Sequence, residues 1–161
     1  MKCSIDTSAL RWLNTVGRLN LLPRLYSELN VPLGVYRQIS RYGKIVNFVE
    51  ENAKVLRPTD VNKYQSKLNK LTESLKWPDP VDVDVLLTYQ ETDSDEMLFS
   101  NKEAERRFVG FGIVRDVYQL YSLAERKGIY SRQDSLKYIR DLLKFDYRRK
   151  DLTSLLEQLL S

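Results

Sequence analysis

Acidic and amide side chains stand at a few positions where a short apolar run gives way to polar residues. Asp6 follows the apolar stretch at the start of the chain, and Asn101 comes shortly after the apolar run 96–99. Asp82 and Asp84 lie in the first turn of a predicted helix. Carboxylate and amide oxygens suit Mg²⁺, and a bound Mg²⁺ can orient a water for attack on a phosphodiester. These residues are therefore the first candidates for a reactive site.

Composition excludes several other kinds of chemistry. The chain of 161 residues has no histidine and only one cysteine, Cys3. It therefore has no Ser-His-Asp or Cys-His catalytic set, no histidine zinc site and no internal disulfide. Enzymatic chemistry would have to come from carboxylates, amides, hydroxyls, Lys, Arg or Tyr. The formal net charge of +4 allows a phosphate-bearing partner but does not require one.

Targeting signals are not apparent in the sequence. No apolar run approaches the roughly 18 residues that a membrane-spanning helix needs. The N-terminus lacks the charged-then-apolar pattern of a secretory signal. We therefore expect a cytoplasmic protein with no membrane partner. The length and the 42% hydrophobic content suit one domain.

Short apolar segments alternate with longer helical patterns along the chain. Predicted strands cover residues 2–6, 30–33, 53–58, 96–99 and 110–114. Predicted helices cover residues 9–16, 19–29, 34–52 (with a break near Gly43), 59–77, 80–91, 100–108, 117–127, 132–145 and 149–160. This alternation predicts an α/β fold with a parallel sheet covered on both faces. Ligands of such sheets bind beyond the carboxyl ends of the strands, where Asp6, Asn101 and Asp116 would lie.

Each candidate also has a structural explanation. Asp6, Asn101 and Asp116 each precede a predicted helix, and Asp and Asn are common N-caps. Asp82 and Asp84 in a first turn are explained by the helix dipole alone. Residue type and position therefore leave both the capping and the chemical interpretation open.

The order of these segments resembles the PIN-domain family, the fold of many metal-dependent ribonucleases, including the toxins of prokaryotic toxin–antitoxin pairs. SIDTSAL resembles the family's opening strand–Asp–x–Ser–x–Leu, and LYSELNVPLGVYRQI and MLFSNKEAERRFVGFGI resemble two later segments. VYQLYSLAERKGIYS is similar to a branch of small archaeal and bacterial PIN proteins. The resemblance covers about residues 2–128. It implies a three-layer α/β/α fold in which 1–161 form a single PIN-like domain, with a core of about 1–128 and extra C-terminal helices over about 131–160.

The resemblance also implies four positions for the acids that PIN nucleases gather. These positions fall on Asp6, Gln38, Asp82 and Asn101. Two of them are amides, which can coordinate Mg²⁺ but bring no negative charge. We therefore expect Asp6 and Asp82, with Asp84 as an alternate, to hold Mg²⁺ or Mn²⁺ if the protein is active, and cleavage to be weakened or absent. Asp84 and Asp116 are the acids that could replace the missing ones.

Basic residues offer a further role. The resemblance implies an arginine shortly after the Asn101 position, where Arg106 and Arg107 stand, and we expect these two residues and Ser8 to contact phosphate. The C-terminal stretch KYIRDLLKFDYRRK interleaves cations with rings: Lys137, Arg140, Lys144, Arg148, Arg149 and Lys150 with Tyr138, Phe145 and Tyr147. It is either an RNA-contacting surface or a solvated helix face with its rings in the core. We favour the solvated face, since charged faces are the norm on surface helices.

Two functions of different classes follow. The first is a PIN-domain protein of the toxin-like ribonuclease type, in which metal-dependent RNA cleavage is weakened or lost and RNA or an antitoxin-like protein is bound. The second is a non-catalytic interaction or dimerisation module with no nucleic-acid role. Either would be expected to form a homo-oligomer. Salt-dependent RNA binding separates them, because phosphate contacts release counterions.

Overall fold

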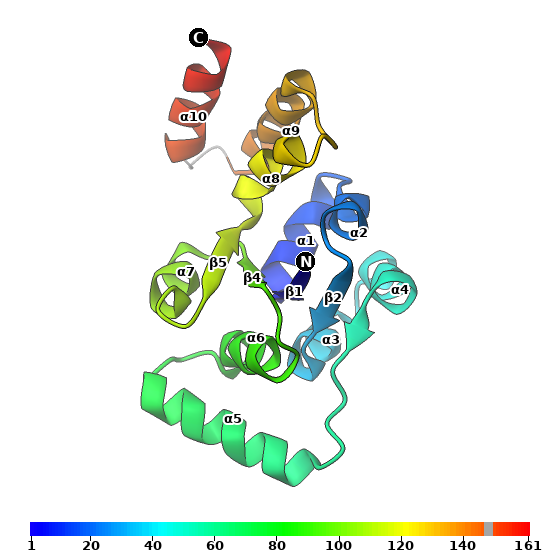
Figure 1. Cartoon of the computed structure of the whole chain (residues 1–161), viewed down its shortest axis with the longest axis vertical. Coiled ribbons are helices and arrows are strands. Elements are labelled where there is room, and N and C mark those ends of the chain that lie inside the picture. Colours follow the sequence, from blue (N-terminus) through cyan, green and yellow to red (C-terminus); the bar gives the residue numbers. More distant parts are fainter. Residues whose placement is uncertain (147–149) are drawn as a thin grey trace.

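Within the described residues, 1–146 and 150–161 of this computed structural model, short parallel strands form the centre of the molecule (Figure 1). The strands are β1 (Lys2–Ile5), β2 (Glu28–Val31), β3 (Lys54–Val55), β4 (Glu96–Phe99) and β5 (Ile113–Asp116). Their order in the sheet is β3-β2-β1-β4-β5, and every pair is parallel. The predicted α/β class, a PIN-like three-layer fold with a short-stranded parallel sheet, is confirmed.

Helices connect the strands and cover the sheet. They are α1 (Thr7–Thr15), η1 (Leu19–Leu21), α2 (Leu22–Leu25), α3 (Leu33–Ile39), α4 (Gly43–Asn52), α5 (Val61–Leu75), α6 (Pro80–Glu91), α7 (Lys102–Phe108), η2 (Val117–Gln119), α8 (Leu120–Arg126), α9 (Arg132–Phe145) and α10 (Lys150–Leu160). In Figure 1, α5 and α10 lie at opposite ends of the molecule. Among the described residues, no helix is both long enough and apolar enough to cross a membrane.

The direction of the strand order reverses at β1. The chain runs outward from β1 through β2 to β3, returns to β4 on the other side of β1, and continues to β5. Right-handed crossovers then place the helices of the first half on one face and α5 to α7 on the other. The hydroxyl of Ser4 in β1 donates to the Val85 carbonyl oxygen of α6 at 2.9 Å, which puts α6 on the Ser4 face. After β1 the chain continues toward β2, and after β4 it continues toward β5, in the opposite direction. The carboxyl ends of β1 and β4 therefore border a space between these two connections.

Helix α9 contributes to the central core. Its side chains of Tyr138, Ile139 and Leu142 are fully buried, and the Tyr138 hydroxyl donates to the Val117 carbonyl oxygen at 2.6 Å. Phe145 at the end of α9 is instead 51% exposed, so the interleaved rings of the C-terminal stretch divide between core and surface. The stretch's Tyr147, Arg148 and Arg149 lie outside the described residues.

The prediction of one helix over 19–29 is wrong. The chain forms η1 and the four-residue α2, and Tyr26 then takes an extended conformation before β2 begins at Glu28. The apolar residues in this stretch are also spaced as in a helix, which explains the error. Pairing with β1 decides the outcome, because it places Glu28 and Leu29 opposite Lys2 and Cys3. Parallel pairing over this distance leaves no local signal.

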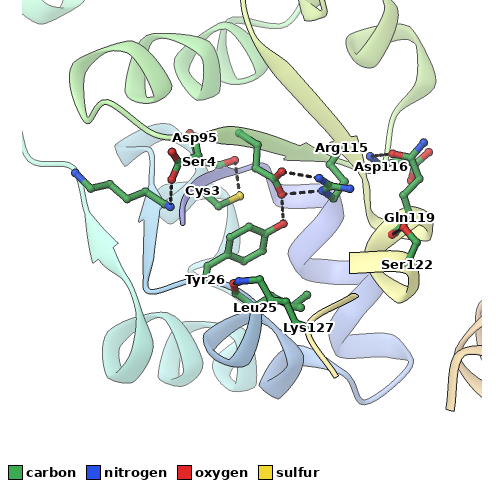
Figure 2. A network of polar contacts seen from close by, with 12 residues as sticks. Cys3, Ser4, Leu25, Tyr26, Asp95, Arg115, Asp116, Gln119, Ser122 and Lys127 are labelled. Atoms are coloured by element: carbon green, nitrogen blue, oxygen red, sulfur yellow. Dashed lines mark hydrogen bonds and ion pairs between the residues drawn. The ribbon is translucent and has the colours of Figure 1, made fainter. Parts of the chain in front are cut away.

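A buried ion pair joins β4 to its neighbour β5 at one edge of the sheet (Figure 2). Glu96, which is 1% exposed at the start of β4, accepts hydrogen bonds from Nε and a terminal nitrogen of Arg115 in β5, both at 2.8 Å. The hydroxyl of Tyr26 donates to the same carboxylate. Burying a carboxylate is costly unless it is paired and hydrogen-bonded. The bidentate contact and the tyrosine together offset that cost and tie β4, β5 and the α2–β2 connection.

We predict that Arg115→Met lowers the free energy of unfolding by about 3–5 kcal/mol, because it leaves the Glu96 carboxylate buried without a cation. Urea denaturation at neutral pH measures the loss. The triple variant Tyr26→Phe, Glu96→Leu, Arg115→Met removes both charges and the hydroxyl that donates to them, and should regain most of the lost stability. A triple variant no more stable than Arg115→Met would contradict this account.

Candidate functional site

A cleft of about 230 Å³ opens at the carboxyl ends of β1 and β4, where the strand order reverses. Its walls are Asp6, Thr7, Ser8, Arg11, Gln38, Asp79, Asp82 and Asn101. Open parallel sheets bind ligands at such switch points. The backbone N–H of Asp6 donates to the Leu98 carbonyl oxygen at 3.1 Å, which extends the β1–β4 pairing to the cleft floor. The four positions predicted from the sequence thus meet in one cleft.

Asp6 is both a helix cap and a cleft wall. Its Oδ1 accepts a hydrogen bond from the Ala9 backbone N–H at 2.6 Å, and its Oδ2 accepts one from the Ser8 hydroxyl. The side chain is only 3% exposed. Burial, together with the nearby Asp82 carboxylate, raises the pKa of Asp6 to about 7, although both hydrogen bonds oppose the shift. Near neutral pH the Asp6 carboxyl is therefore partly protonated.

Two acids of α6 complete the acidic side of the cleft. Asp79 is the N-cap of α6 and accepts from the Val81 backbone N–H at 2.9 Å, while Asp82 accepts from the Trp77 indole N–H at 3.0 Å. Burial raises the pKa of Asp82, and the neighbouring Asp79 adds to that increase. Asp79 was not among the site residues predicted from the sequence. Its position directly before Pro80, at a helix start, was the signal that it shares this helix end with Asp82.

The two amides are already engaged as acceptors. Gln38 Oε1 in α3 accepts from the Thr7 hydroxyl at 2.5 Å, which joins α3 to α1. Asn101 Oδ1 accepts from the Glu103 backbone N–H at 2.9 Å as the N-cap of α7. Each amide oxygen keeps a second lone pair for a ligand.

The cleft suits a hard cation in donor type but not in charge. Carboxylate, amide and hydroxyl oxygens are the donors that Mg²⁺ and Mn²⁺ take. Within the described parts of the chain, however, no three acidic residues gather closely enough to hold a metal ion. Two carboxylates and two amides bring less negative charge to a divalent ion than four carboxylates would.

Asp84, the alternate metal ligand, does not line the cleft. Its two oxygens accept from the Gly34 backbone N–H at 3.0 Å and from the Tyr64 hydroxyl at 2.5 Å. The residue is 3% exposed, and a Cβ added at Gly34 would come within 2.9 Å of its Oδ2. Asp84 therefore ties α6 to α3 and α5.

Asp116 also lies away from the cleft. It ends β5 and accepts from the Tyr118 backbone N–H at 3.0 Å as the cap of η2. Together with Arg106 it lines a separate cavity of about 820 Å³ between α7, α8 and α10. The capping interpretation of Asp116 accounts for its place in the fold.

The expected phosphate contacts divide between the cleft and other surfaces. Ser8 lines the cleft, whereas Arg106 lies in the separate cavity. Arg107 donates to the Leu75 carbonyl oxygen, and its guanidinium lies 5.8 Å from the centre of the Trp77 ring. The basic residue that does line the cleft is Arg11, which the sequence analysis did not single out. Its place three residues after Ser8 on α1 was the available signal.

A family model described as PIN domain matches residues 3–153. The chain belongs to the PIN-domain family. The match extends past the 2–128 resemblance and includes α9, in agreement with the burial of that helix in this PIN domain. No curated protein and no solved structure matches the chain.

The raised pKa of Asp6 predicts a pH-dependent stability difference from the variant Asp6→Asn, which keeps a capping oxygen but cannot ionise. The folded state holds a proton on Asp6 up to a pH of about 7, whereas the unfolded chain releases it near 4, so the native protein loses stability as pH rises through this window. Relative to the variant, the protein should lose roughly 1–3 kcal/mol between about pH 5 and pH 8.5. Urea unfolding across this range measures it; a difference that stays constant with pH would refute the assignment.

Proposed function

We propose that this PIN-domain protein is of the toxin-like ribonuclease type and binds RNA at the cleft, with metal-dependent cleavage weakened or lost. The observation that carries the proposal is the meeting of Asp6, Gln38, Asp82 and Asn101 in one cleft, with amides at two of the four positions. At the four positions that the resemblance implies, the cleft has two carboxylates and two amides, and Asp79 adds a third carboxylate to its wall. An antitoxin-like protein remains a candidate partner for the same surface.

The electrostatics of the cleft support weak metal binding. A metal ligand must be deprotonated, and burial holds the pKa of Asp6 near 7 and raises that of Asp82. Metal affinity should therefore be lowest in mild acid and increase with pH. If a divalent ion binds, Asp6 and Asp82 would hold it, and the ion would supply polarisation of a phosphodiester oxygen. The amides Gln38 and Asn101 would contribute neutral oxygens.

A second candidate, the interaction module with no nucleic-acid role, is favoured by a different surface. Val109, Phe111 and Ile113, around the start of the edge strand β5, are 61%, 43% and 59% exposed. Exposed apolar side chains close together mark partner surfaces more often than chance. RNA binding that is absent or insensitive to salt would favour this candidate over the first.

Restoring the two acids should strengthen metal binding. The double variant Gln38→Glu, Asn101→Asp is expected to bind Mn²⁺ about tenfold or more tightly than the original chain, because it adds two carboxylates to the cleft. Isothermal titration calorimetry measures the change. The matched control Asn62→Asp, Gln133→Glu makes the same charge change at exposed sites on α5 and α9.

An RNA cleavage assay in Mn²⁺ completes the experiment. Any activity of the restored variant should disappear when Asp6→Asn is added. Equal Mn²⁺ affinity in the restored and control variants, or cleavage that survives Asp6→Asn, would sink the site assignment.

A further inference from the structure

A second pocket, of about 440 Å³, adjoins the cleft, and we call it the arginine pocket. Its described lining residues are Thr7, Arg11, Arg37, Gln38, Ser40, Arg41 and Tyr42. None of these described residues is acidic. Among the ion pairs of the described chain, none involves the three arginines. Three exposed guanidinium groups thus share one pocket, and among them Arg37 also acts electrostatically on the buried Asp84 carboxylate.

Tyr42 organises two of the arginines. The guanidinium carbons of Arg11 and Arg41 lie 5.2 Å and 5.1 Å from the centre of its ring. Cation–π contacts of this length favour a position of the guanidinium group near the ring. The positive charges that gather around Tyr42 repel one another, and a bound anion would offset that repulsion. The planar fork of arginine matches the oxygens of a phosphate group.

The arginine pocket is continuous with the cleft and with a third pocket. It shares Thr7, Arg11 and Gln38 with the cleft. The third pocket, of about 320 Å³, is lined by Ser8, Arg11, Trp12, Thr15 and Phe145, and shares Ser8 and Arg11 with the cleft. Neighbouring turns of α1 therefore form a common floor. This floor runs from the arginine pocket through the cleft to the third pocket, which the aromatic rings of Trp12 and Phe145 line.

We propose that the arginine pocket binds a backbone phosphate of a single-stranded RNA whose chain crosses the cleft, while a base stacks on Phe145. Single strands alternate phosphates with bases, and proteins bind them by combining cations with exposed rings. Phe145 is half exposed and faces a pocket, as a stacking platform requires. An acidic peptide would use the arginines but not the rings. The path across the cleft rests on the proposed function, but the phosphate contact requires no metal and no cleavage.

Fluorescence anisotropy with a short labelled oligouridine, in EDTA and over a series of salt concentrations, tests the phosphate contact. The double variant Arg11→Gln, Arg41→Gln should weaken binding about tenfold, and the salt slope should become shallower by about 0.7 for the lost phosphate contact. The variant Arg11→Lys, Arg41→Lys keeps the charge and should keep the slope, but it should lose part of the affinity together with the guanidinium forks.

A matched control removes the same charge elsewhere. Arg24 and Arg126 are exposed residues of α2 and α8. They lie near the amino ends of the strands, since the neighbouring Lys127 donates to the Leu25 carbonyl oxygen just before β2. The variant Arg24→Gln, Arg126→Gln should change affinity by less than about twofold if contacts, rather than net charge, govern binding. Equal losses of oligouridine affinity in the two glutamine variants would contradict the proposed phosphate contact in the arginine pocket.

The stacking contact has its own test. Phe145→Ala should lose about fivefold in affinity for oligouridine but nothing for an abasic phosphodiester strand. Equal effects on both strands, tighter binding of the matching deoxy strand, or binding of poly-glutamate in place of RNA would each overturn the assignment. Because EDTA removes metal, this result is independent of the Mn²⁺ titration, so failure of either proposal is distinguishable from failure of the other.

Discussion

The lateral pairing of β1 with β4 is the constraint on which the rest of this molecule depends. Residues 6–95 separate these strands in the chain, yet the register places Ile5 opposite Leu98, and the Asp6 backbone continues the ladder. Because the strand order reverses there, the helices that follow each strand leave in different directions. Polar side chains at the two strand ends are left facing a shared space. A shift of this register by one residue would turn buried side chains of β1 toward the opposite face of the sheet.

Burial and charge pull against each other in the cleft. Closure by α1, α3 and α6 removes water from Asp6 and Asp82, and the loss of water favours their neutral forms. With carboxylates at all four positions, a bound cation would offset the free-energy cost of burying their charges. With amides at Gln38 and Asn101, the protein itself offsets part of this cost. Hydrogen bonds from Ser8 and Ala9 stabilise the Asp6 carboxylate, and one from Trp77 stabilises that of Asp82. Among the described arginines of this region, Arg11 lines the cleft itself, and Arg37 and Arg41 lie beside it in the arginine pocket.

The sequence predicted the elements with strong local signals. Asp60 before α5 and Ser131 before α9 are caps that fix helix starts, and the run Glu96–Phe99 is buried along its whole length as a central parallel strand should be. The resemblance placed the four cleft positions, since it carries spacing between distant segments. Asp84 shows what sequence cannot supply: it stands two residues from Asp82, but a helix turns about 200° over that step, and Gly34 and Tyr64 occupy its oxygens. Arg11 illustrates the opposite case, a site residue that the sequence did not reveal. The residues that share its pocket, Arg37, Arg41 and Tyr42, lie outside α1 and are distant in the chain.

The hydrogen bonds of the two amides have a consequence for substitutions at these positions. Gln38 accepts from Thr7, and Asn101 accepts from Glu103, through oxygens that a glutamate or an aspartate would also present. An exchange between amide and acid at either place would therefore keep the hydrogen bond that joins α1 to α3 or the cap of α7. What it would change is the charge of the cleft, and with it the repulsion that Asp6 and Asp82 already feel.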